Sequence, residues 1–447
     1  MVAALSLSIS RTLTVSAPAA LRYRSGSPET PPRLASGLRP AAGDPARMPN
    51  LTPRSLDRRL KRHLTRSDQG FSVTCLPGLE DLLRADLETV EGVSITQSRP
   101  GGVELTAPFA AVYELVTHQP VAERVFLHIA ELRGESLTWI YNGLSKIAWE
   151  LYVGFRPQVA VSGYARGSKL THGGKIAEVA FKAISNRMKQ LGQNTLRDDA
   201  DPLRVHVRVL DDRAHVSLDA SGPPMGRRAF TPEGVGESLD ATFAAGLLKR
   251  LDAASEPVLL DPFCGGATLP IEAALMRLGR SPHRGRSSAL EHWPAFRAEL
   301  LSRALEKAGR AAPGPQRILG MDRNDRVAEL AREAAQAAGV ADEVEIECRD
   351  WKTLGKHEVS KGPPGLLVAQ PPSGRKTGQE GRVKRLYKQL ARDLGSLLPG
   401  WRVALLVHRP ELIKDLGLQG ERRTELSLGR ETLTLIEGRI AKARGRR

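Results

Sequence analysis

One short segment limits the possible folds of this chain more than any other. It spans residues 257–276, PVLLDPFCGGATLPIEAALM, and predicts an apolar strand, a glycine turn and a helix. The turn contains Asp261, Gly265 and Gly266, and the first helical turn accommodates Pro270. Glycines let a ligand approach the backbone, and the helix N-terminus offers free N–H groups, so such a turn suits a small ligand in an α/β protein. The spacing matches neither the GxGxxG dinucleotide motif nor a phosphate loop that ends in GK[ST].

Two acidic residues follow the next predicted strands. Asp322 ends RILGMD, and Asp350 ends EIECRD. A carboxylate after the second strand can accept hydrogen bonds from both ribose hydroxyls, and one after the third can accept from an adenine amino group. Each acid alone could be a helix cap or a solvated charge, and the glycine turn alone could be structural. The three features in succession favour an adenosyl cofactor.

The elements predicted around this segment divide the chain into regions. Strands and helices alternate from residue 257 to 407, which predicts a doubly wound, mostly parallel α/β sheet. The segment TELSLGRETLTLIEG predicts an antiparallel hairpin at its edge. We therefore predict a disordered extension at 1–50, a basic arm or helix at 51–70, an α+β region without catalytic motifs at 71–222, and the doubly wound domain at 223–447, with the boundary in the Gly- and Pro-rich stretch 221–234.

The charge of the chain indicates a polyanionic partner. The formal net charge is +16 and the pI is near 10.1, which favours nucleic acid, although biased codon usage would also produce an Arg-rich composition. In the segment RSLDRRLKRHLTR, Leu56, Leu60 and Leu64 recur at helical spacing among basic residues. The segment is either an arm that contacts RNA phosphates or a helix that packs its leucine stripe on the next domain.

Cysteine content and hydropathy give weaker information about location. Cys75, Cys264 and Cys348 are far apart and form no CxxC motif, so neither a disulfide framework nor a zinc site is indicated, and a reducing, cytoplasmic compartment fits. No stretch approaches the roughly 18 apolar residues of a membrane span. Residues 1–47 resemble a transit peptide in composition, or else precede the true start at Met48. Nothing requires more than a monomer.

The segment DPFCGGATLPIEAAL at 261–275 is similar to the cofactor motif DPFCGSGTLLIEAAL of the THUMP-domain RNA methyltransferases, particularly those that methylate a guanine 2-amino group in large-subunit ribosomal RNA. Gly266 occupies the Ser position, and Ala267 replaces a glycine. The resemblance continues upstream in VSGYARGSKLTHGGKIAEVAFKAISNRM, TLRDDADPLRVHVRVLDDRAHVSLDASG and GRRAF, and it covers roughly residue 71 to the C-terminus.

This resemblance implies a class I methyltransferase domain that binds S-adenosyl-L-methionine, preceded by a ferredoxin-like and THUMP region that binds RNA. The chemistry needs no metal. By the same resemblance, the methionine end of the cofactor contacts Asp261, Phe263, Gly265, Gly266 and Thr268, the ribose contacts Asp322, and the adenine contacts Asp350.

The family pattern after the fourth strand is Asn-Pro-Pro-Tyr, and this chain has Gln370, Pro371, Pro372 and Ser373. An exocyclic amine is a poor nucleophile because its lone pair is delocalised into the ring. In the family pattern, the side-chain carbonyl and the next proline's carbonyl accept the two N–H protons, and the aromatic ring stacks on a flipped-out base. The amide of Gln370 lies one methylene farther out, and Ser373 offers no ring.

Other residues could supply the missing ring and contact the RNA. The candidate aromatic residues are Phe230, Tyr387 and Trp401. Basic residues that could hold RNA phosphates, or form an ordinary solvated helix face, are Arg375, Lys376, Arg382, Lys384 and Arg385.

The leading hypothesis is methyl transfer from S-adenosyl-L-methionine to a guanine 2-amino group in ribosomal RNA. One alternative is an RNA-binding or ribosome-assembly protein that has lost catalysis, in which QPPS is only a proline-rich strand exit. Another is a transfer RNA guanine methyltransferase. A methyltransferase for small molecules or proteins is disfavoured by the basic N-terminal region.

Overall fold

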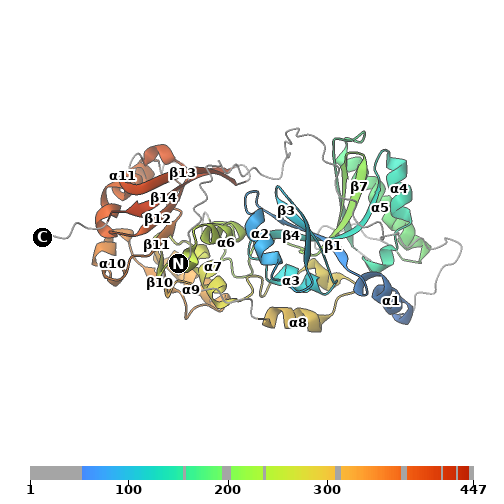
Figure 1. Ribbon diagram of the computed structural model, residues 1–447, viewed down its shortest axis with the longest axis horizontal. Helices are drawn as coiled ribbons and strands as arrows, with labels where there is room; N and C mark the ends of the chain where they lie inside the picture. Colours follow the sequence, from blue (N-terminus) through green and yellow to red (C-terminus); the bar gives the residue numbers. More distant parts are fainter. Residues whose placement is uncertain are drawn as a thin grey trace, which may run out of the picture.

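The computed structural model describes residues 53–154, 158–193, 203–234, 238–307, 314–373, 380–413, 416–428 and 431–441. The predicted disorder of residues 1–50 lies outside these ranges. Two seven-stranded sheets form the molecule, one toward each end of its long axis (Figure 1). Within the described ranges no helix has the length and apolar character needed to cross a membrane.

The first sheet has the strand order β2-β3-β1-β4-β7-β6-β5. Its strands are β1 (Gln69–Cys75), β2 (Ser94–Arg99), β3 (Gly102–Ala107), β4 (Ala122–Arg133), β5 (Val159–Arg166), β6 (Leu203–Leu210) and β7 (Arg213–Asp219). Its helices are α1 (Pro53–Leu60), α2 (Glu80–Leu87), α3 (Ala111–Thr117), α4 (Leu137–Ser145) and α5 (Gly173–Gln190), with the short turns η1 (Lys61–Thr65) and η2 (Trp149–Leu151). Strand β4 pairs with both β1 and β7, so a β-α-β-β-α-β unit and a second α/β unit share one continuous sheet.

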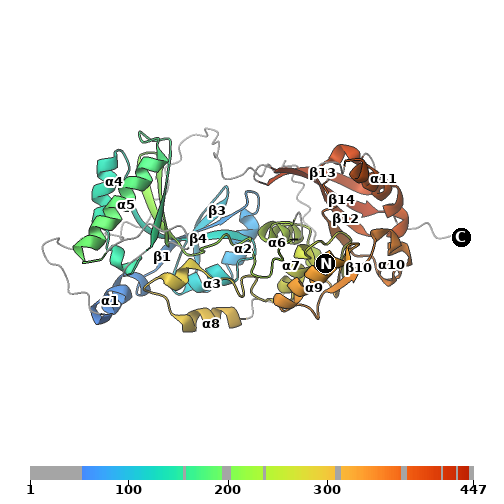
Figure 2. The same cartoon turned by 180° about the vertical axis from the view of Figure 1, so that it is seen from behind.

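Alternation along β6 shows how the sequence produces a one-sided sheet. Val205, Val207 and Val209 are fully buried, whereas Arg204 and Arg208, which alternate with them, are exposed. Helices α4 and α5 lie on the side of this sheet that faces away from the second sheet, as Figures 1 and 2 agree. The arginine face of β6 is therefore turned toward the rest of the molecule.

The leucine stripe of the basic N-terminal segment packs into this first core. Leu60 is 3% exposed and Leu64 1% exposed, and Arg59 pairs with the buried Glu150 at 2.9 Å. The segment thus packs its leucines on the next domain, which is the second of the two alternatives that the sequence left open.

The second sheet confirms the doubly wound prediction. Its order is β10-β9-β8-β11-β12-β14-β13, with the first five strands parallel and the last two forming the predicted antiparallel hairpin. The strands are β8 (Val258–Asp261), β9 (Arg317–Asp322), β10 (Glu345–Cys348), β11 (Leu366–Ala369), β12 (Arg402–Val407), β13 (Leu418–Leu428) and β14 (Glu431–Ile440). The helices and short turns are α6 (Ala241–Arg250), η3 (Ala253–Ser255), α7 (Thr268–Leu278), η4 (Ala289–His292), α8 (Ala298–Glu306), α9 (Asp325–Ala337), η5 (Trp351–Lys356), α10 (Glu358–Lys361), α11 (Glu380–Leu397) and η6 (Pro410–Leu412).

The core of this sheet is split between its two faces by side-chain alternation. Leu259 and Val368 pack with α6 and α7 on one face, while Leu260 and Ala369 pack with α11 on the other. Because both faces of these strands are buried, their sequences are continuous apolar runs.

The segment between α7 and β9 returns to the first sheet, which the sequence did not predict. Leu290, Trp293 and Ala304 belong to the first hydrophobic core, and the backbone N–H of Arg297 donates to the Tyr113 hydroxyl at 2.7 Å. Helix α8 accordingly lies beside α3 (Figure 1). The two parts of the chain are therefore interlocked rather than joined by one linker.

Candidate cofactor and catalytic site

The candidate site lies along the carboxyl ends of four adjacent strands. Asp261 ends β8, Asp322 ends β9, Asp350 follows β10, and Gln370 follows β11. These strands are neighbours in the order β10-β9-β8-β11. The carboxyl edge of an open parallel sheet is where such folds bind ligands, so the four predicted side chains share the expected edge.

The Asp261 carboxylate organises the glycine turn from inside. It is 3% exposed, and its Oδ1 accepts a hydrogen bond from the Phe263 backbone N–H at 3.1 Å. The Cys264 backbone N–H donates to the Met321 carbonyl at 2.9 Å, which ties the turn to the end of β9. Burial, reinforced by the nearby Asp322 carboxylate, raises the pKa of Asp261 to about 7.

The turn enters α7 through two left-handed residues. Gly265 has φ 53°, and Ala267, at the N-cap of α7, has φ 58° and ψ 29°. Alanine in this conformation costs about 1–2 kcal/mol that glycine would not. The replacement of the family's glycine by Ala267 therefore leaves a left-handed turn intact but strained.

Asp322 and Asp350 both cap the turns that follow them. The Asp322 carboxylate accepts from the Asn324 backbone N–H at 2.8 Å, and the Asp350 carboxylate accepts from the Lys352 N–H at 3.0 Å. Each uses one oxygen in this way and is only half-buried. A second oxygen of each carboxylate can therefore accept from a ligand. The ring centroids of the half-buried Phe263 and the buried Trp351 lie 6.3 Å apart, so Trp351 packs beneath the one ring of the pair that is accessible near these strand ends.

The QPPS segment leaves β11 in a turn fixed by α11. The Tyr387 hydroxyl donates to the Pro372 carbonyl at 3.2 Å. Gln370 is half-buried and Pro372 is exposed, whereas Ser373 is only 4% exposed. Of the two polar side chains in this segment, Gln370 is thus the one that a base could reach.

The three aromatic residues that we considered as stacking partners for a base are all buried, so that expectation was wrong. Tyr387 is 0% and Trp401 1% exposed, because both fill the core under α11. Phe230, at 9% exposure, also packs in a core, against α6 and α7. None of the three rings offers a face to a base. Of the basic residues after QPPS, Arg382, Lys384 and Arg385 lie exposed on α11, and Arg375 and Lys376 lie outside the described residues.

Comparison with known proteins identifies this part of the chain. A family model described as RMKL-like, methyltransferase domain, matches residues 227–436. Residues 227–436 belong to the RMKL-like methyltransferase family. A second model, the RlmL ferredoxin-like domain, matches residues 71–126, which contain most of the β-α-β-β-α-β unit. The predicted family and fold are confirmed for both parts.

Curated relatives and solved structures extend this likeness over most of the chain. A ribosomal RNA large subunit methyltransferase K/L from Syntrophotalea carbinolica is 29% identical over 385 residues, which cover 84% of this chain and 54% of the relative. The chain thus spans about half the length of the relatives it matches. A possible methylase from Clostridium difficile superposes with a TM-score of 0.71 at 23% identity, covering 85% of this chain and 100% of that one. A putative methyltransferase complexed with SAH gives 0.69 at 22% identity, covering 86% and 100%.

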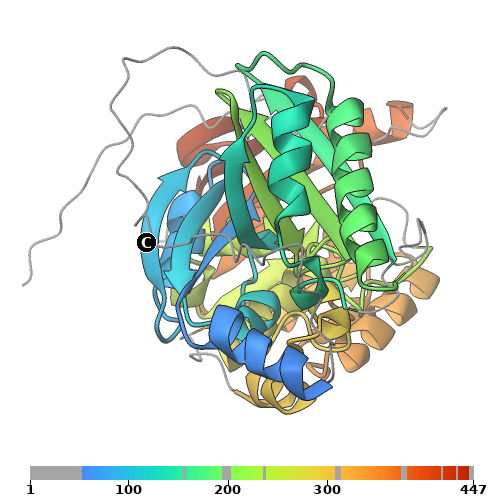
Figure 3. The same cartoon turned by 90° about the vertical axis from the view of Figure 1, so that its right-hand side faces the viewer.

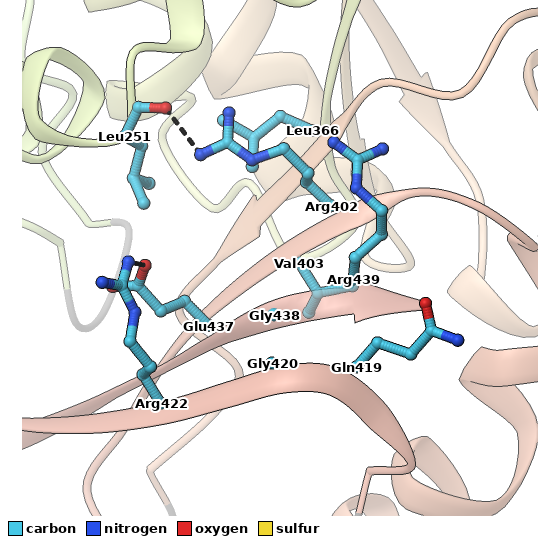
Figure 4. Close-up of a pocket in the computed structure, with 10 residues that line it drawn as sticks. All are labelled: Leu251, Leu366, Arg402, Val403, Gln419, Gly420, Arg422, Glu437, Gly438 and Arg439. Carbon is cyan, nitrogen blue, oxygen red and sulfur yellow. Dashed lines mark hydrogen bonds and ion pairs between the residues drawn. The ribbon is translucent and has the colours of Figure 1, made fainter. Parts of the chain in front are cut away.

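A pocket of about 250 Å³ in the RMKL-like domain lies away from the candidate site. It lies at the opposite edge of the sheet, because Leu366 and Arg402 begin β11 and β12. Figure 4 shows Arg402 turned toward the Leu251 carbonyl, to which it donates at 2.9 Å. The remaining lining residues are Val403, Gln419, Gly420, Arg422, Glu437, Gly438 and Arg439. Among the described residues, no cluster of three potential metal ligands was found.

The sequence did not reveal a buried ion pair at the start of the RMKL-like domain. Arg228 donates to both carboxylate oxygens of Glu272 in α7, at 2.8 and 3.2 Å, and both side chains are fully buried. Arg228 lies in the segment GRRAF, which the family resemblance included only as part of a linker.

Proposed function

We propose that this protein transfers a methyl group from S-adenosyl-L-methionine to the 2-amino group of a guanine in ribosomal RNA. The observation that carries the proposal is the row of Asp350, Asp322, Asp261 and Gln370 along one edge of the RMKL-like sheet. Three carboxylates suit a cofactor with adenine, ribose and cationic groups, and the amide lies next in the row, where a reacting amine would meet the methyl group.

In this proposal the glycine turn holds the methionine end of the cofactor. Asp261 orients the turn through Phe263, while Gly265, Gly266 and the first helical residue Thr268 leave backbone N–H groups near the ligand. Asp322 accepts from the ribose hydroxyls, and Asp350 accepts from the adenine amino group. When bound, the cofactor supplies the electrophilic methyl group.

The protein's catalytic contribution is to orient the target amine. The Gln370 side-chain carbonyl and the Pro371 backbone carbonyl accept its two N–H protons, which directs the nitrogen lone pair out of the ring plane. Pro372 and Ser373 complete the turn, with Tyr387 holding the Pro372 carbonyl. The longer glutamine side chain places its carbonyl by rotation of one additional bond.

We further propose that RNA binds the face of the first sheet that carries Arg204, His206 and Arg208. The strand register places Tyr164 beside Arg208, and His215 on its other side. Tyr164 is 40% exposed, which gives a base a ring on which to stack next to a cation. We call Tyr164, Arg204, His206, Arg208 and His215 the open face.

Several features of the open face support this role. His206 shares a hydrogen bond with Ser162 at 2.7 Å and contacts the edge of Phe126 at 5.0 Å between ring centroids. Burial lowers the pKa of His206 to about 4, so its ring is neutral at pH 7 and the arginines carry the charge. In the view along the molecule, helices α4 and α5 stand in front of this sheet and the RMKL-like domain lies behind it (Figure 3). RNA on the open face would therefore lie on the side of the first sheet nearer the RMKL-like domain.

We expect the enzyme to act as a monomer in the cytoplasm. The proposed RNA-binding face and the proposed cofactor site belong to the same chain, so one copy carries both. Cys75, Cys264 and Cys348 are free thiols, which suits a reducing compartment.

One observation favours a second candidate, an RNA-binding or assembly protein that no longer transfers methyl groups. Ser373 is buried where the family has a tyrosine, and Phe230, Tyr387 and Trp401 do not replace that ring. Such a protein would bind RNA, and cofactor as well, without turnover.

RNA binding is tested by reversing charge on each side of the first sheet. The double variant Arg204→Glu/Arg208→Glu should bind unmodified large-subunit ribosomal RNA at least about tenfold more weakly in a filter-binding assay. The slope of the logarithm of its binding constant against the logarithm of salt concentration should become shallower by about one unit per lost phosphate contact. The matched control Lys182→Glu/Lys189→Glu makes the same charge change on α5, which covers the opposite side of the sheet and where both lysines are exposed. Equal losses in both variants would show a non-specific charge effect and refute the open face.

A further inference from the structure

A cluster of buried polar side chains joins the turn between α3 and β4 to the helix that follows the glycine turn. We call Arg228, Glu272, Ser281 and His283 the junction. Arg228 comes from the segment between the two sheets, Glu272 from the first turns of α7, and the other two from the chain just beyond α7. All four are at most 5% exposed. Burial of charged and polar groups is costly unless each is paired, so such a junction has a definite geometry.

Three junction side chains bind carbonyl groups of one turn. Ser281 Oγ donates to the Thr117 carbonyl at 2.6 Å, the ring of His283 contacts the Gln119 carbonyl through Nε2 at 3.1 Å, and Arg228 donates to the Pro120 carbonyl at 2.8 Å. This turn leads directly into β4, the strand shared by both halves of the first sheet. A shift of that sheet therefore moves the carbonyls that hold the junction.

On its other side, the junction holds α7. Arg228 binds both oxygens of Glu272, which lies one helical turn after Thr268, where α7 leaves the glycine turn. Arg228 also donates to the Met225 carbonyl at 2.7 Å and lies 3.2 Å from Nδ1 of His283. Burial lowers the pKa of His283 well below its ordinary value, so the ring is neutral and can accept from the guanidinium. A planar guanidinium with several fixed partners has little rotational freedom.

We infer that Arg228 is a positioning residue that couples RNA binding on the first sheet to cofactor binding at the glycine turn. The inference rests on the proposed function, because it requires both ligands. RNA on the first sheet fixes the turn at Thr117–Pro120, the junction transmits that constraint to α7, and the glycine turn then loses less freedom when cofactor binds. Cofactor must then strengthen RNA binding by the same factor by which RNA strengthens cofactor binding, because linkage is reciprocal.

The coupling is measured by titrating S-adenosylhomocysteine, which cannot react, into the full-length protein with and without saturating unmodified large-subunit ribosomal RNA. We expect RNA to tighten S-adenosylhomocysteine binding by at least about fivefold, the lower end of typical coupling between sites. We call the dissociation constant without RNA divided by that with RNA the coupling ratio. In Glu272→Gln, which keeps the side-chain shape but weakens the ion pair, the coupling ratio should fall toward one. In the double variant Arg228→Met/Glu272→Leu, which replaces the buried pair with apolar side chains, the ratio should be one even where thermal stability is kept.

Arg250→Met is the matched control. Arg250 also joins the two parts of the chain, through Asp81 and the Gly78 carbonyl, but it lies in α6 and makes its hydrogen bonds away from α7. Its coupling ratio should equal that of the unmodified protein. A ratio of one in the unmodified protein, or an unchanged ratio in the Arg228→Met/Glu272→Leu variant, would overturn the inference. Failure of the unmodified protein to bind either ligand would instead contradict the proposed function.

Discussion

The Tyr387 hydroxyl donates a hydrogen bond to the Pro372 carbonyl at 3.2 Å. Tyr387 is fully buried in α11, so this bond fixes the QPPS turn to the core of the RMKL-like domain. Since Gln370 and Pro371 precede the anchored carbonyl directly, the position of their acceptor oxygens depends on it. A tyrosine from a neighbouring helix thus stabilises a turn whose own last residue, Ser373, contributes no ring.

Replacing Tyr387 with Phe should lower turnover about ten- to a hundredfold, because a displacement of about 1 Å in a reacting group costs up to that factor. Affinity for S-adenosylhomocysteine should stay within about twofold, since the Tyr387 hydroxyl bonds to the QPPS turn and not to the three carboxylates that we propose bind the cofactor. Single-turnover kinetics and calorimetric titration measure the two quantities separately. Unchanged turnover in a folded Tyr387→Phe protein would show that the anchor is not needed.

Asp322→Ala should weaken S-adenosylhomocysteine binding about ten- to a hundredfold, because a hydrogen bond to a charged group is worth about 1.5–3 kcal/mol. The matched control is Asp325→Ala, which removes an exposed carboxylate at the start of α9. Calorimetric titration of both variants decides the point. Equal affinity for the two would remove Asp322 from the cofactor site.

The stability of the ligand-free protein should depend on pH through Asp261. Its folded-state pKa of about 7 lies above the ordinary 3.8, so the folded state holds this proton more tightly. The stabilisation is complete below about pH 4 and is lost as pH rises through about 7. Relative to Asp261→Asn, the unmodified protein should therefore lose of order 4 kcal/mol of unfolding free energy across that range, at about 1.4 kcal/mol per pKa unit.

Urea unfolding of both proteins at several pH values between about 4 and 8 measures this difference. The amide oxygen introduced by Asp261→Asn can still accept from the Phe263 N–H, so the glycine turn should persist in the variant. Parallel pH profiles for the two proteins would mean that Asp261 titrates in its ordinary range.

The local patterns of the sequence were sufficient to predict the fold of the RMKL-like domain. Asp261 and Asp322 end β8 and β9, whose preceding apolar residues are buried, so the change from apolar to acidic residues marks both strand ends in the sequence, and Asp350 follows the next strand in the same way along the chain. Their polar endings are therefore visible in the sequence. The parallel sheet then brings these endings to one edge, without any need to know the packing of the helices.

The sequence could not predict contacts that depend on packing between distant segments. No sequence pattern marks Arg228 and Glu272 as partners, and only the folded chain shows that they form an ion pair away from solvent. Tyr387 and Trp401 were plausible base-stacking residues because aromatic type does not reveal burial. The return of the segment around Trp293 to the first core was missed for the same reason.

The most direct test of the account is nucleoside mass spectrometry on unmodified ribosomal RNA after incubation with the protein and isotopically labelled S-adenosyl-L-methionine. The same experiment with unmodified transfer RNA identifies the RNA class, and Gln370→Ala is the paired variant. We predict labelled N2-methylguanosine in large-subunit ribosomal RNA from the unmodified protein and none from Gln370→Ala, which should still bind S-adenosylhomocysteine. Undiminished transfer by Gln370→Ala, or no transfer by an unmodified protein that binds both RNA and S-adenosylhomocysteine, would contradict the account.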